Sequence, residues 1–457
     1  MNIFLIVALG LPGLGLVILV HELGHFLAAR AVGIEVETFS LGWGPRVAGF
    51  KRGGTDYRIS AFPIGGYCLM RGETEFRAAL EKRSDEIPRV PGTFYGASPW
   101  RRILVSLAGP LANVLLAALL FMAVAGMGFD LQTRGNRIVL ASEFSTDSGT
   151  RASAFPADLA GLKSGDAVVE IEGRKVSDFY DLQDAINAAS PGARIGVYPW
   201  VDPLVSAVQA GSSAELAGVL PGDLLVSLGG KPVRHMMELF YLLRDKPERA
   251  TLGLRRGSEN LELPLVLSWQ ANGESNLGLA FRSITHHERP SSLASTLPAG
   301  IERTYSTFAL TLRSLGTLVS RNGGAALHVK ALRDGATLSF EVKPSMAGVT
   351  FTDSFSGPAR ITWMIGTIAN QGIGEGGPSG LSKFLDILAF LSIGLFIMNL
   401  LPIPALDGGQ ILLFLVESAR RKPLKTRTVY RFQVIGAFIV LAIFLLAMAS
   451  DLIFFSK

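Results

Sequence analysis

The stretch GLVILVHELGHFLAAR, residues 15–30, places polar side chains inside an apolar run. Residues 3–20 are almost wholly apolar, long enough for a helix of about 20 residues that crosses a bilayer. Ionisable side chains are costly inside a membrane and usually mark function there. His21, Glu22 and His25 are therefore the first candidate site of the chain.

The spacing of these residues indicates a metal site. On a helix, His21 and His25 are one turn apart and face the same way, as two ligands of one ion must. Glu22 lies beside them and would act as a general base towards water at the metal. We expect one zinc ion per chain, because two imidazoles, a carboxylate and an open position form the usual hydrolytic zinc site.

The third ligand has to come from elsewhere in the chain. Asp407 is the outstanding candidate, in the segment NLLPIPALDGG of residues 399–409. Its prolines and glycines break a helix, and irregular backbone at membrane depth is tolerated where it lines a cavity. Taken alone, Asp407 could equally cap a helix end at the membrane face. The buried HExxH motif lacks a carboxylate ligand, and this favours Asp407 as a metal ligand over Asp407 as a helix cap.

The composition is that of a membrane protein. Of 457 residues, 49% are hydrophobic and 18% charged, against about 25% charged in soluble proteins, and the mean hydropathy is +0.36. The net charge of +5 is spread through loops without a basic block, so we expect no nucleic acid as partner. Cys68 is the only cysteine, which excludes an intrachain disulfide.

Four windows are long and apolar enough to span a membrane, namely Ile3–Ala29, Ile103–Phe129, Phe384–Leu401 and Val434–Phe455. The first has no basic residue before Arg30, so we expect it to be a span and not a cleaved signal peptide.

Basic residues predict the orientation of these spans. The loops 30–102 and 418–431 are expected to be cytoplasmic, and the second of them holds six basic residues and no acid. Both termini and the segment 130–383 then lie on the opposite side, the periplasm in the case of a bacterial inner membrane. The sequence thus predicts a multi-pass protein of the inner membrane.

The segment 130–383 contains an internal repeat. ADLAGLKSGDAVVEIEGRKV (157–176) aligns with AELAGVLPGDLLVSLGGKPV (214–233) at an offset of 57, with nine of twenty positions identical. Each copy has a Gly-Asp turn, a short apolar strand, a Gly turn and a helix. This order resembles PDZ domains, which bind extended peptides or chain ends at a sheet edge.

The first copy departs from that pattern, because it stops at GARIGVYPW (192–200) where a closing hairpin should follow. Residues 326–342 alternate like two strands around an Asp-Gly turn. They either complete the first repeat from a distance or form an independent hairpin near the membrane. Residues 301–319 are expected to form an amphipathic helix on the membrane surface.

An HExxH motif in a first span, PDZ-like repeats and a late LDGG segment together resemble the site-2 protease family of intramembrane zinc metalloproteases, peptidase family M50, in its bacterial RseP branch. The resemblance covers nearly the whole chain. It implies a zinc metalloendopeptidase with His21, His25 and Asp407 as ligands and Glu22 as catalytic base. The implied substrates are single-pass membrane proteins, such as an anti-sigma factor, or remnant signal peptides. They would be cut within or near their transmembrane segments.

The resemblance also implies residues that bind substrate. Asn399, Pro402 and Pro404 precede the ligand, where Asn399 could hold an unwound substrate strand. Asn113, in the motif GPLAN, would be a polar contact near the site, although small residues there also allow close helix packing. The family often has histidine after LDGG, and this chain has Gln410.

Gly65 and Gly66 lie in YRISAFPIGGYCLM (57–70), which alternates like a strand pair. In the family this segment resembles a hairpin that dips into the membrane. Its edge could pair with peptide groups that a substrate helix exposes as it unwinds in lipid. An ordinary cytoplasmic hairpin is the alternative.

The expected fold is a polytopic α-helical membrane protein with about four spanning helices, two inserted periplasmic PDZ-like β-rich domains and a membrane-associated β-hairpin. The expected divisions are a membrane catalytic part (1–130), a first and apparently incomplete PDZ-like domain (131–199), a second one (200–282), an amphipathic helix with a β-hairpin near the membrane surface (283–356), and the last two spans with the LDGG segment (357–457).

A second function class is a catalytically silent membrane scaffold whose PDZ-like repeats bind periplasmic peptides. The intact set of His21, Glu22, His25 and Asp407 counts against it, because a scaffold has no need of them together. A metal-ion transporter would need more intramembrane carboxylates than Asp386 and Asp451.

Overall fold

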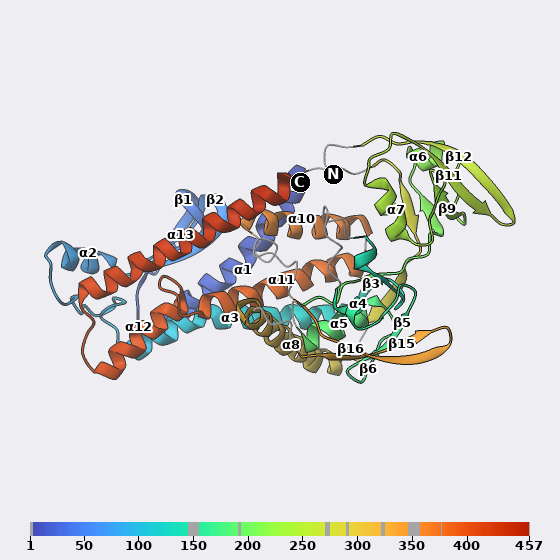
Figure 1. Cartoon of the computed structure of the whole chain (residues 1–457). Coiled ribbons are helices and arrows are strands. Elements are labelled where there is room, and N and C mark those ends of the chain that lie inside the picture. The colour runs from blue at the N-terminus through green and yellow to red at the C-terminus, as the bar shows by residue number, and fades with distance from the viewer. Residues whose placement is uncertain are drawn as a thin grey trace. The chain divides into compact units, whose positions relative to one another are not determined.

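The computed structural model describes residues 3–144, 155–190, 193–269, 275–288, 292–320, 325–345, 357–375 and 377–456. The chain forms two compact units. The first consists of Met1–Phe129, His287–Leu312 and Val349–Lys457 and contains the long helices. The second consists of Asp130–His286 and Arg313–Gly348 and contains most of the strands (Figure 1).

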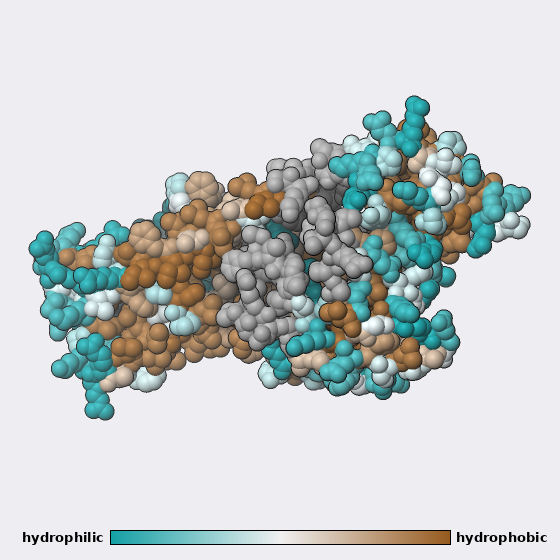
Figure 2. Space-filling view, viewed as in Figure 1, coloured by the Kyte–Doolittle hydropathy of each residue, from teal (hydrophilic) through white to brown (hydrophobic). Residues whose placement is uncertain are grey.

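Four helices of the first unit are long and apolar enough to cross a membrane. They are α1 (Ile3–Ala31), α3 (Pro99–Met127), α11 (Gly377–Leu400) and α13 (Thr426–Ser456). Figure 2 shows mostly hydrophobic side chains over α13 and its neighbours, with hydrophilic ones at the end that carries α2 (Glu73–Glu81). The four predicted windows are confirmed as helices of spanning length.

Two further helices of this unit are α10 (Pro358–Glu375) and α12 (Asp407–Arg420). The sequence did not predict α10, whose residues are less apolar than those of the spans. It packs closely on α1, because a Cβ on Gly10 would come within 2.1 Å of the Thr362 carbonyl oxygen. Gly366 approaches the backbone of Ile6 in the same way. The two glycines let α10 lie directly against the helix of the HExxH motif.

β1 (Val36–Arg52) and β2 (Thr55–Met70) pair with each other in a small sheet. The prediction that residues 57–70 form a strand pair of their own is wrong, because both halves of this segment lie in β2 and pair with β1 instead of with each other. Residues 36–41 pair on one side with 56–59 and on the other side with 66–70. Residues 66–70 are therefore an outer strand. Among the described residues, no other strand pairs with their free edge.

The second unit contains two four-stranded antiparallel sheets. The sheet of the first repeat has the order β16 (Ala336–Val342), β15 (Leu327–Arg333), β5 (Ala167–Ile171), β6 (Arg174–Lys175). The sheet of the second repeat has the order β10 (Lys231–Pro232), β9 (Leu224–Leu228), β11 (Arg249–Arg256), β12 (Glu259–Val266).

Shorter elements complete each repeat. The strand pairs are β4 (Ile138–Leu140) with β7 (Val197–Pro199), β8 (Val205–Val208) with β13 (Leu279–Phe281), and β3 (Phe129–Thr133) with β14 (Ile284–Glu288). The helices are η1 (Ala141–Glu143), α4 (Pro156–Leu159), α5 (Phe179–Ala189), α6 (Ser213–Leu216) and α7 (Met236–Leu243). Each repeat has its own apolar core, with α5 packed in the first and α7 in the second.

The hairpin β15–β16 belongs to the first repeat. β15 pairs with β5, and Leu327, Val329 and Ala331 are buried in the core of that repeat. The prediction of an independent hairpin near the membrane, which grouped these strands with residues 283–356, is therefore wrong. The physical reason is that β5 needs a strand on its open edge, and the chain supplies that strand only after it has built the second repeat.

Matching ion pairs show that the two repeats close in the same way. In the second repeat, Arg256 pairs with buried Asp223 at 2.7 Å and also donates to the Gly218 carbonyl. In the first, Arg333 pairs with buried Asp166 at 2.7 Å and donates to the Gly161 carbonyl. Asp166 and Asp223 are 57 residues apart in sequence, and so are Gly161 and Gly218. This distance is the offset of the repeat. Arg256 holds the pKa of Asp223 below its ordinary value.

Replacing Arg333 by glutamine leaves the Asp166 carboxylate buried without its charged partner. We expect the free energy of unfolding of this repeat to fall by about 3 kcal/mol, because removing one partner of a buried ion pair costs about 3–5 kcal/mol. Hydrogen exchange of β5 and β15 in denaturant would measure the loss. The control is Arg174→Gln, whose pair with Asp184 is exposed. Equal exchange in both variants would contradict the prediction.

The predicted amphipathic helix is present as the longer α8 (Leu293–Ser320). Its residues up to Leu312 belong to the first unit. There Arg303 lies 2.8 Å from Asp386 of α11, and Phe308 contacts Phe396 of the same helix. This part of α8 therefore packs against a span, which its apolar face alone did not predict. Its position at a membrane surface stays a prediction.

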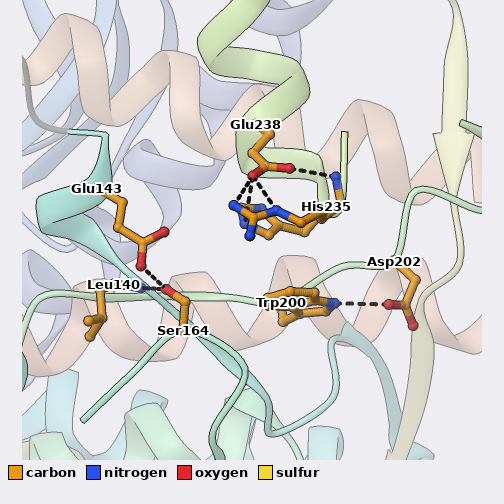
Figure 3. Close-up of polar contacts among 8 residues, drawn as sticks. Leu140, Glu143, Ser164, Trp200, Asp202, His235 and Glu238 are labelled. Atoms are coloured by element: carbon orange, nitrogen blue, oxygen red, sulfur yellow. Dashed lines mark hydrogen bonds and ion pairs between the residues drawn. The ribbon is translucent and has the colours of Figure 1, made fainter. Parts of the chain in front are cut away.

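A small cavity of about 420 Å³ lies where the two repeats meet within the second unit. His235 is 1% exposed there and lies over the ring of Trp200, with 4.6 Å between centroids (Figure 3). Glu143 accepts a hydrogen bond from Ser164 across the cavity (Figure 3). Among the residues that the structure describes, His235 Nδ1 has no hydrogen-bond partner, and Nε2 lies 3.9 Å from Glu238 Oε1.

This junction predicts a dependence of stability on pH. Burial lowers the pKa of His235 below its ordinary value of 6.5, against the opposite influence of Glu238 and Glu143; Arg234 and Arg137 act with burial. The unfolded chain therefore binds the proton more readily. The stabilising contribution is complete above pH 6.5 and decreases as the pH falls below it.

Hydrogen exchange of α7 at pH 7.5 and pH 5.5 measures this effect. We expect faster opening at pH 5.5 in the full chain, and a smaller difference in His235→Phe, which cannot be protonated. Asp223 does not contribute to this difference, because its pKa is lowered from an ordinary value of 3.8 and its carboxylate stays ionised in both states at pH 5.5. The comparison between them isolates the histidine, and an equal pH effect in both would contradict the prediction.

Candidate metal centre and active site

Three side chains from distant parts of the sequence meet in the first unit. His21 and His25 lie on α1, and Asp407 is the first residue of α12. Asp407 Oδ2 is 3.2 Å from His21 Nε2 and 3.4 Å from His25 Nε2, and the two Nε2 atoms are 3.1 Å apart. Among the described residues, these three side chains form a group whose ligand atoms lie close enough together to hold one metal ion.

The donor set fits zinc. Zinc–ligand bonds of about 2.0–2.1 Å in a tetrahedron put ligand atoms about 3.3 Å apart. The three observed separations of 3.1, 3.2 and 3.4 Å agree with that spacing. Two imidazoles and one carboxylate leave a fourth position free, as hydrolytic zinc sites require.

Helix α3 orients both histidines. His25 Nδ1 lies 2.8 Å from the Val105 carbonyl oxygen, to which it can only donate, so Nε2 keeps its lone pair. The carboxamide of Asn113 lies 3.3 Å from His21 Nδ1, and its Oδ1 is buried without a partner. Carboxamide oxygen and nitrogen exchange places by a flip. With the oxygen towards Nδ1–H, Asn113 Oδ1 accepts a hydrogen bond and His21 Nε2 keeps its lone pair.

Glycines bring α1 and α3 close enough for this contact. A Cβ on Gly24 would lie 2.3 Å from the Ala108 carbonyl oxygen. A Cβ on Gly109 would lie 2.3 Å from His25 Nε2. Both distances are too short for real atoms, so the two positions require glycine for reasons of space.

The substitution Gly109→Ala is therefore expected to displace the His25 ring. Zinc affinity should fall by at least about 10-fold, the lower range for changes to groups that orient metal ligands. Competition with a chromogenic chelator would measure it on purified protein. Gly126→Ala, at a more open position of the same helix, is the matched control. Wild-type affinity in Gly109→Ala would contradict the packing argument.

The break between α11 and α12 exposes Asp407. α11 ends at Leu400, and Ala405 has a positive φ of 76°. Gly408 and Gly409 fold back so tightly that a Cβ on either would lie 2.2 Å from a carbonyl oxygen of residues 400–403. The turn thus points the first residue of α12 into the interior.

The three side chains line a cavity of about 810 Å³. Glu22 lines it too, together with Cys68 of the outer strand 66–70. Burial raises the pKa of the Cys68 thiol to about 12. The thiol is therefore protonated at neutral pH and is no thiolate ligand.

The other predicted site residues are distributed unevenly. Asn399 lines the cavity, whereas Asn113 lies behind His21. Gly66 lies against Glu22, since a Cβ there would be 3.6 Å from Glu22 Cγ. Gly65 lies against Trp43 instead.

Pro402 and Pro404 do not line the cavity. Pro404 supports the turn from behind, because Gly436 of α13 approaches its backbone. The sequence also missed cavity residues outside the motifs, which come from α2, the loop before α3, and α13. These are Glu73, Phe76, Arg77, Leu80, Phe94, Tyr95, Tyr430 and Gln433.

Comparisons with known proteins identify the family. The model of peptidase family M50 matches residues 9–443. A protein of Treponema pallidum named "Putative zinc metalloprotease" is 32% identical over 98% of this chain and 99% of its own length. The "Regulator of sigma E protease" of Salmonella typhi is 26% identical over 96% of both chains.

Among solved structures, the HtrA3 PDZ domain bound to a phage-derived ligand matches 35% of this chain and 93% of its own, with 14% identity. Its TM-score of 0.13 is too low to support an argument about the repeats. The family match covers both the HExxH helix and the LDGG segment. The chain therefore belongs to peptidase family M50, the zinc metalloproteases.

Proposed function

We propose that this zinc metalloprotease hydrolyses peptide bonds within or near the transmembrane segment of single-pass membrane proteins. The observation that carries the proposal is the convergence of His21, His25 and Asp407 beside Glu22, at the wall of a cavity inside a helical unit of membrane-spanning length. His21, His25 and Asp407 would hold the zinc ion.

Bound zinc supplies a Lewis acid and lowers the pKa of water to about 7. Glu22 would take the proton from the attacking water and deliver it to the leaving amine. Glu22 lines the same cavity as Cys68 of the outer strand, and Gly66 of that strand lies against the Glu22 side chain. The base therefore lies next to the place where a substrate strand would pair.

The outer strand 66–70 is the proposed substrate edge. A substrate helix that unwinds in lipid exposes amide groups, each of which costs several kcal/mol without a partner. The free edge of 66–70 supplies partners, as in strand addition to other sheets. Exposed Trp43, Val47, Phe50 and Phe62 on the same hairpin support its association with the membrane.

Asn399, Gly65, Gly66, Pro402, Pro404 and Asn113 are proposed to contribute to substrate binding in different ways. Asn399 would contact the substrate in the cavity, and Gly66 keeps the edge close to Glu22. Gly65, Pro402, Pro404 and Asn113 would act through the groups that they support.

The two repeats are proposed to be PDZ-like domains that bind peptide chain ends and keep untrimmed substrates away. We place the protein in the bacterial inner membrane, with both termini and the second unit in the periplasm and the loops 30–102 and 418–431 in the cytoplasm. An anti-sigma factor or remnant signal peptides are the proposed substrate classes.

Other intramembrane carboxylates have structural partners, which disfavours a transporter. Asp386 lies 2.8 Å from Arg303. Asp451 accepts hydrogen bonds from the backbone N–H groups of Gly357, Ala359 and Arg360 and so caps the start of α10.

A cysteine introduced next to Cys68 provides a direct test of substrate binding. Leu69 lies in the proposed edge and lines the cavity, so a Glu22→Gln, Cys68→Ser, Leu69→Cys variant should form disulfides with a cysteine-free single-pass substrate into which single cysteines are introduced. We expect cross-links at positions of its transmembrane segment with the period of two that a strand requires. Cross-links with a helical period, or none in the spanning segment, would contradict strand addition. The same variant without Leu69→Cys is the control.

A further inference from the structure

We propose that the buried ion pair between Arg102 of α3 and Glu417 of α12 is a positioning device for the third zinc ligand. It holds α12 against α3 so that Asp407, at the start of α12, reaches the two histidines of α1. The inference rests on the proposed zinc ligands. It assigns a role in the reaction to two residues that do not touch the metal centre.

The pair is almost fully buried. Arg102 is 3% and Glu417 5% exposed, and Arg102 Nη2 lies 2.8 Å from Glu417 Oε1. Arg89 lies 3.6 Å from the same oxygen, with its own side chain mostly exposed. Within the described parts of the chain, Arg102 Nε has no hydrogen-bond partner. The guanidinium is thus committed to one carboxylate, and its charge would be uncompensated without it.

Arg102 contacts α12 at a second point. Its guanidinium lies 4.5 Å from the ring centroid of Phe414, which is 3% exposed. Phe414 is seven residues after Asp407, about two helical turns, so both lie on one face of α12. Through Phe414, Arg102 therefore fixes the rotation of α12 about its own axis. Through Glu417, it fixes the position of α12 along the length of α3.

The turn before α12 fixes the start of the helix but not its direction. Gly408 and Gly409 lie tightly against the backbone of residues 400–403, and the turn itself is irregular, with a positive φ at Ala405. α12 has 14 residues and is therefore a rigid rod of about 21 Å. A contact ten residues beyond Asp407 would set the direction of this rod and, together with the turn, the position of the carboxylate.

One helix then sets the geometry of all three ligands. The Val105 carbonyl of α3 orients His25, and Asn113 of α3 orients His21. Arg102 lies one turn before Val105 on the same helix and acts on Asp407 through α12. α3 thus contacts both segments that carry the proposed ligands, α1 and α12, although these ligands are almost 400 residues apart in sequence.

The test uses full-length protein in detergent with Glu417→Gln, Arg102→Gln and the double variant. Arg101→Gln is the matched control, since Arg101 is exposed and adjacent in sequence. Zinc affinity is measured by chelator competition, and ligand geometry by the visible absorption of bound cobalt(II). We expect each single variant to bind zinc about 10- to 100-fold more weakly, the usual effect of groups that orient metal ligands, with an altered cobalt spectrum.

The double variant should be no worse than either single one, because it leaves no unpaired buried charge. Arg102→Lys keeps the charge without the planar group over Phe414, and should fall between wild type and Arg102→Gln. Thermal melting followed by circular dichroism separates these effects from loss of fold.

The proposal is overturned if Glu417→Gln keeps wild-type zinc affinity and cobalt spectrum, even when it melts earlier, because the pair would then be structural only. An Asp407→Asn variant in the same series tests the proposed function separately. If Asp407→Asn binds zinc like wild type, the ligand assignment fails; if it loses zinc while Glu417→Gln does not, only the positioning role fails.

Discussion

Replacing Glu22 by glutamine is expected to lower the rate of substrate cleavage by about 10²–10⁴-fold, the contribution that general acid–base catalysis typically makes. Glutamine has the size of glutamate, but it cannot take a proton. His21, His25 and Asp407 are untouched, so zinc content should remain one per chain.

The measurement is cleavage of a tagged single-pass substrate in proteoliposomes, with zinc content determined on the same samples. Glu35→Gln is a suitable control, since Glu35 forms an exposed pair with Arg71 at the hairpin. If Glu22→Gln retained the wild-type rate, Glu22 would not be the base. If it lost zinc, its role would be structural.

Replacing Asp407 by asparagine is expected to abolish both zinc binding at stoichiometric concentrations and cleavage. The amide removes the negative ligand oxygen that lies 3.2 and 3.4 Å from the histidine nitrogens. Two neutral imidazoles then remain, too few for the three-ligand site of hydrolytic zinc proteins. The expected pattern thus differs from Glu22→Gln, which keeps the metal and loses the rate.

Metal analysis after dialysis against a weak chelator distinguishes the two variants. Asp451→Asn serves as control, because Asp451 is also a buried carboxylate of the first unit but caps α10. Full zinc retention by Asp407→Asn would show that the third ligand is another group.

The convergence of His21, His25 and Asp407 was predictable from the sequence because each part has a local signal. HExxH places two proposed ligands and a proposed base on one helix turn, and the prolines and glycines around Asp407 mark a broken helix. The four spans were predictable from apolar runs of sufficient length. These signals do not depend on how distant segments pack.

The features that the sequence missed are those that depend on such packing. The Val105 carbonyl has no side-chain signature, and Arg102 and Glu417 stand in ordinary basic and mixed segments. α10 is too polar in composition to resemble a span. The sequence did not decide whether the hairpin β15–β16 belongs to the first repeat, because β5, the strand that β15 pairs with, lies more than 150 residues earlier in the chain.

Cleavage inside the membrane is best tested by mass spectrometry of the products from a single-pass substrate, reconstituted in lipid vesicles with zinc-loaded protein. We expect new chain ends within or next to the transmembrane segment, absent with Glu22→Gln and after removal of zinc. Chain ends confined to the soluble parts of the substrate, or identical products with Glu22→Gln, would contradict this expectation.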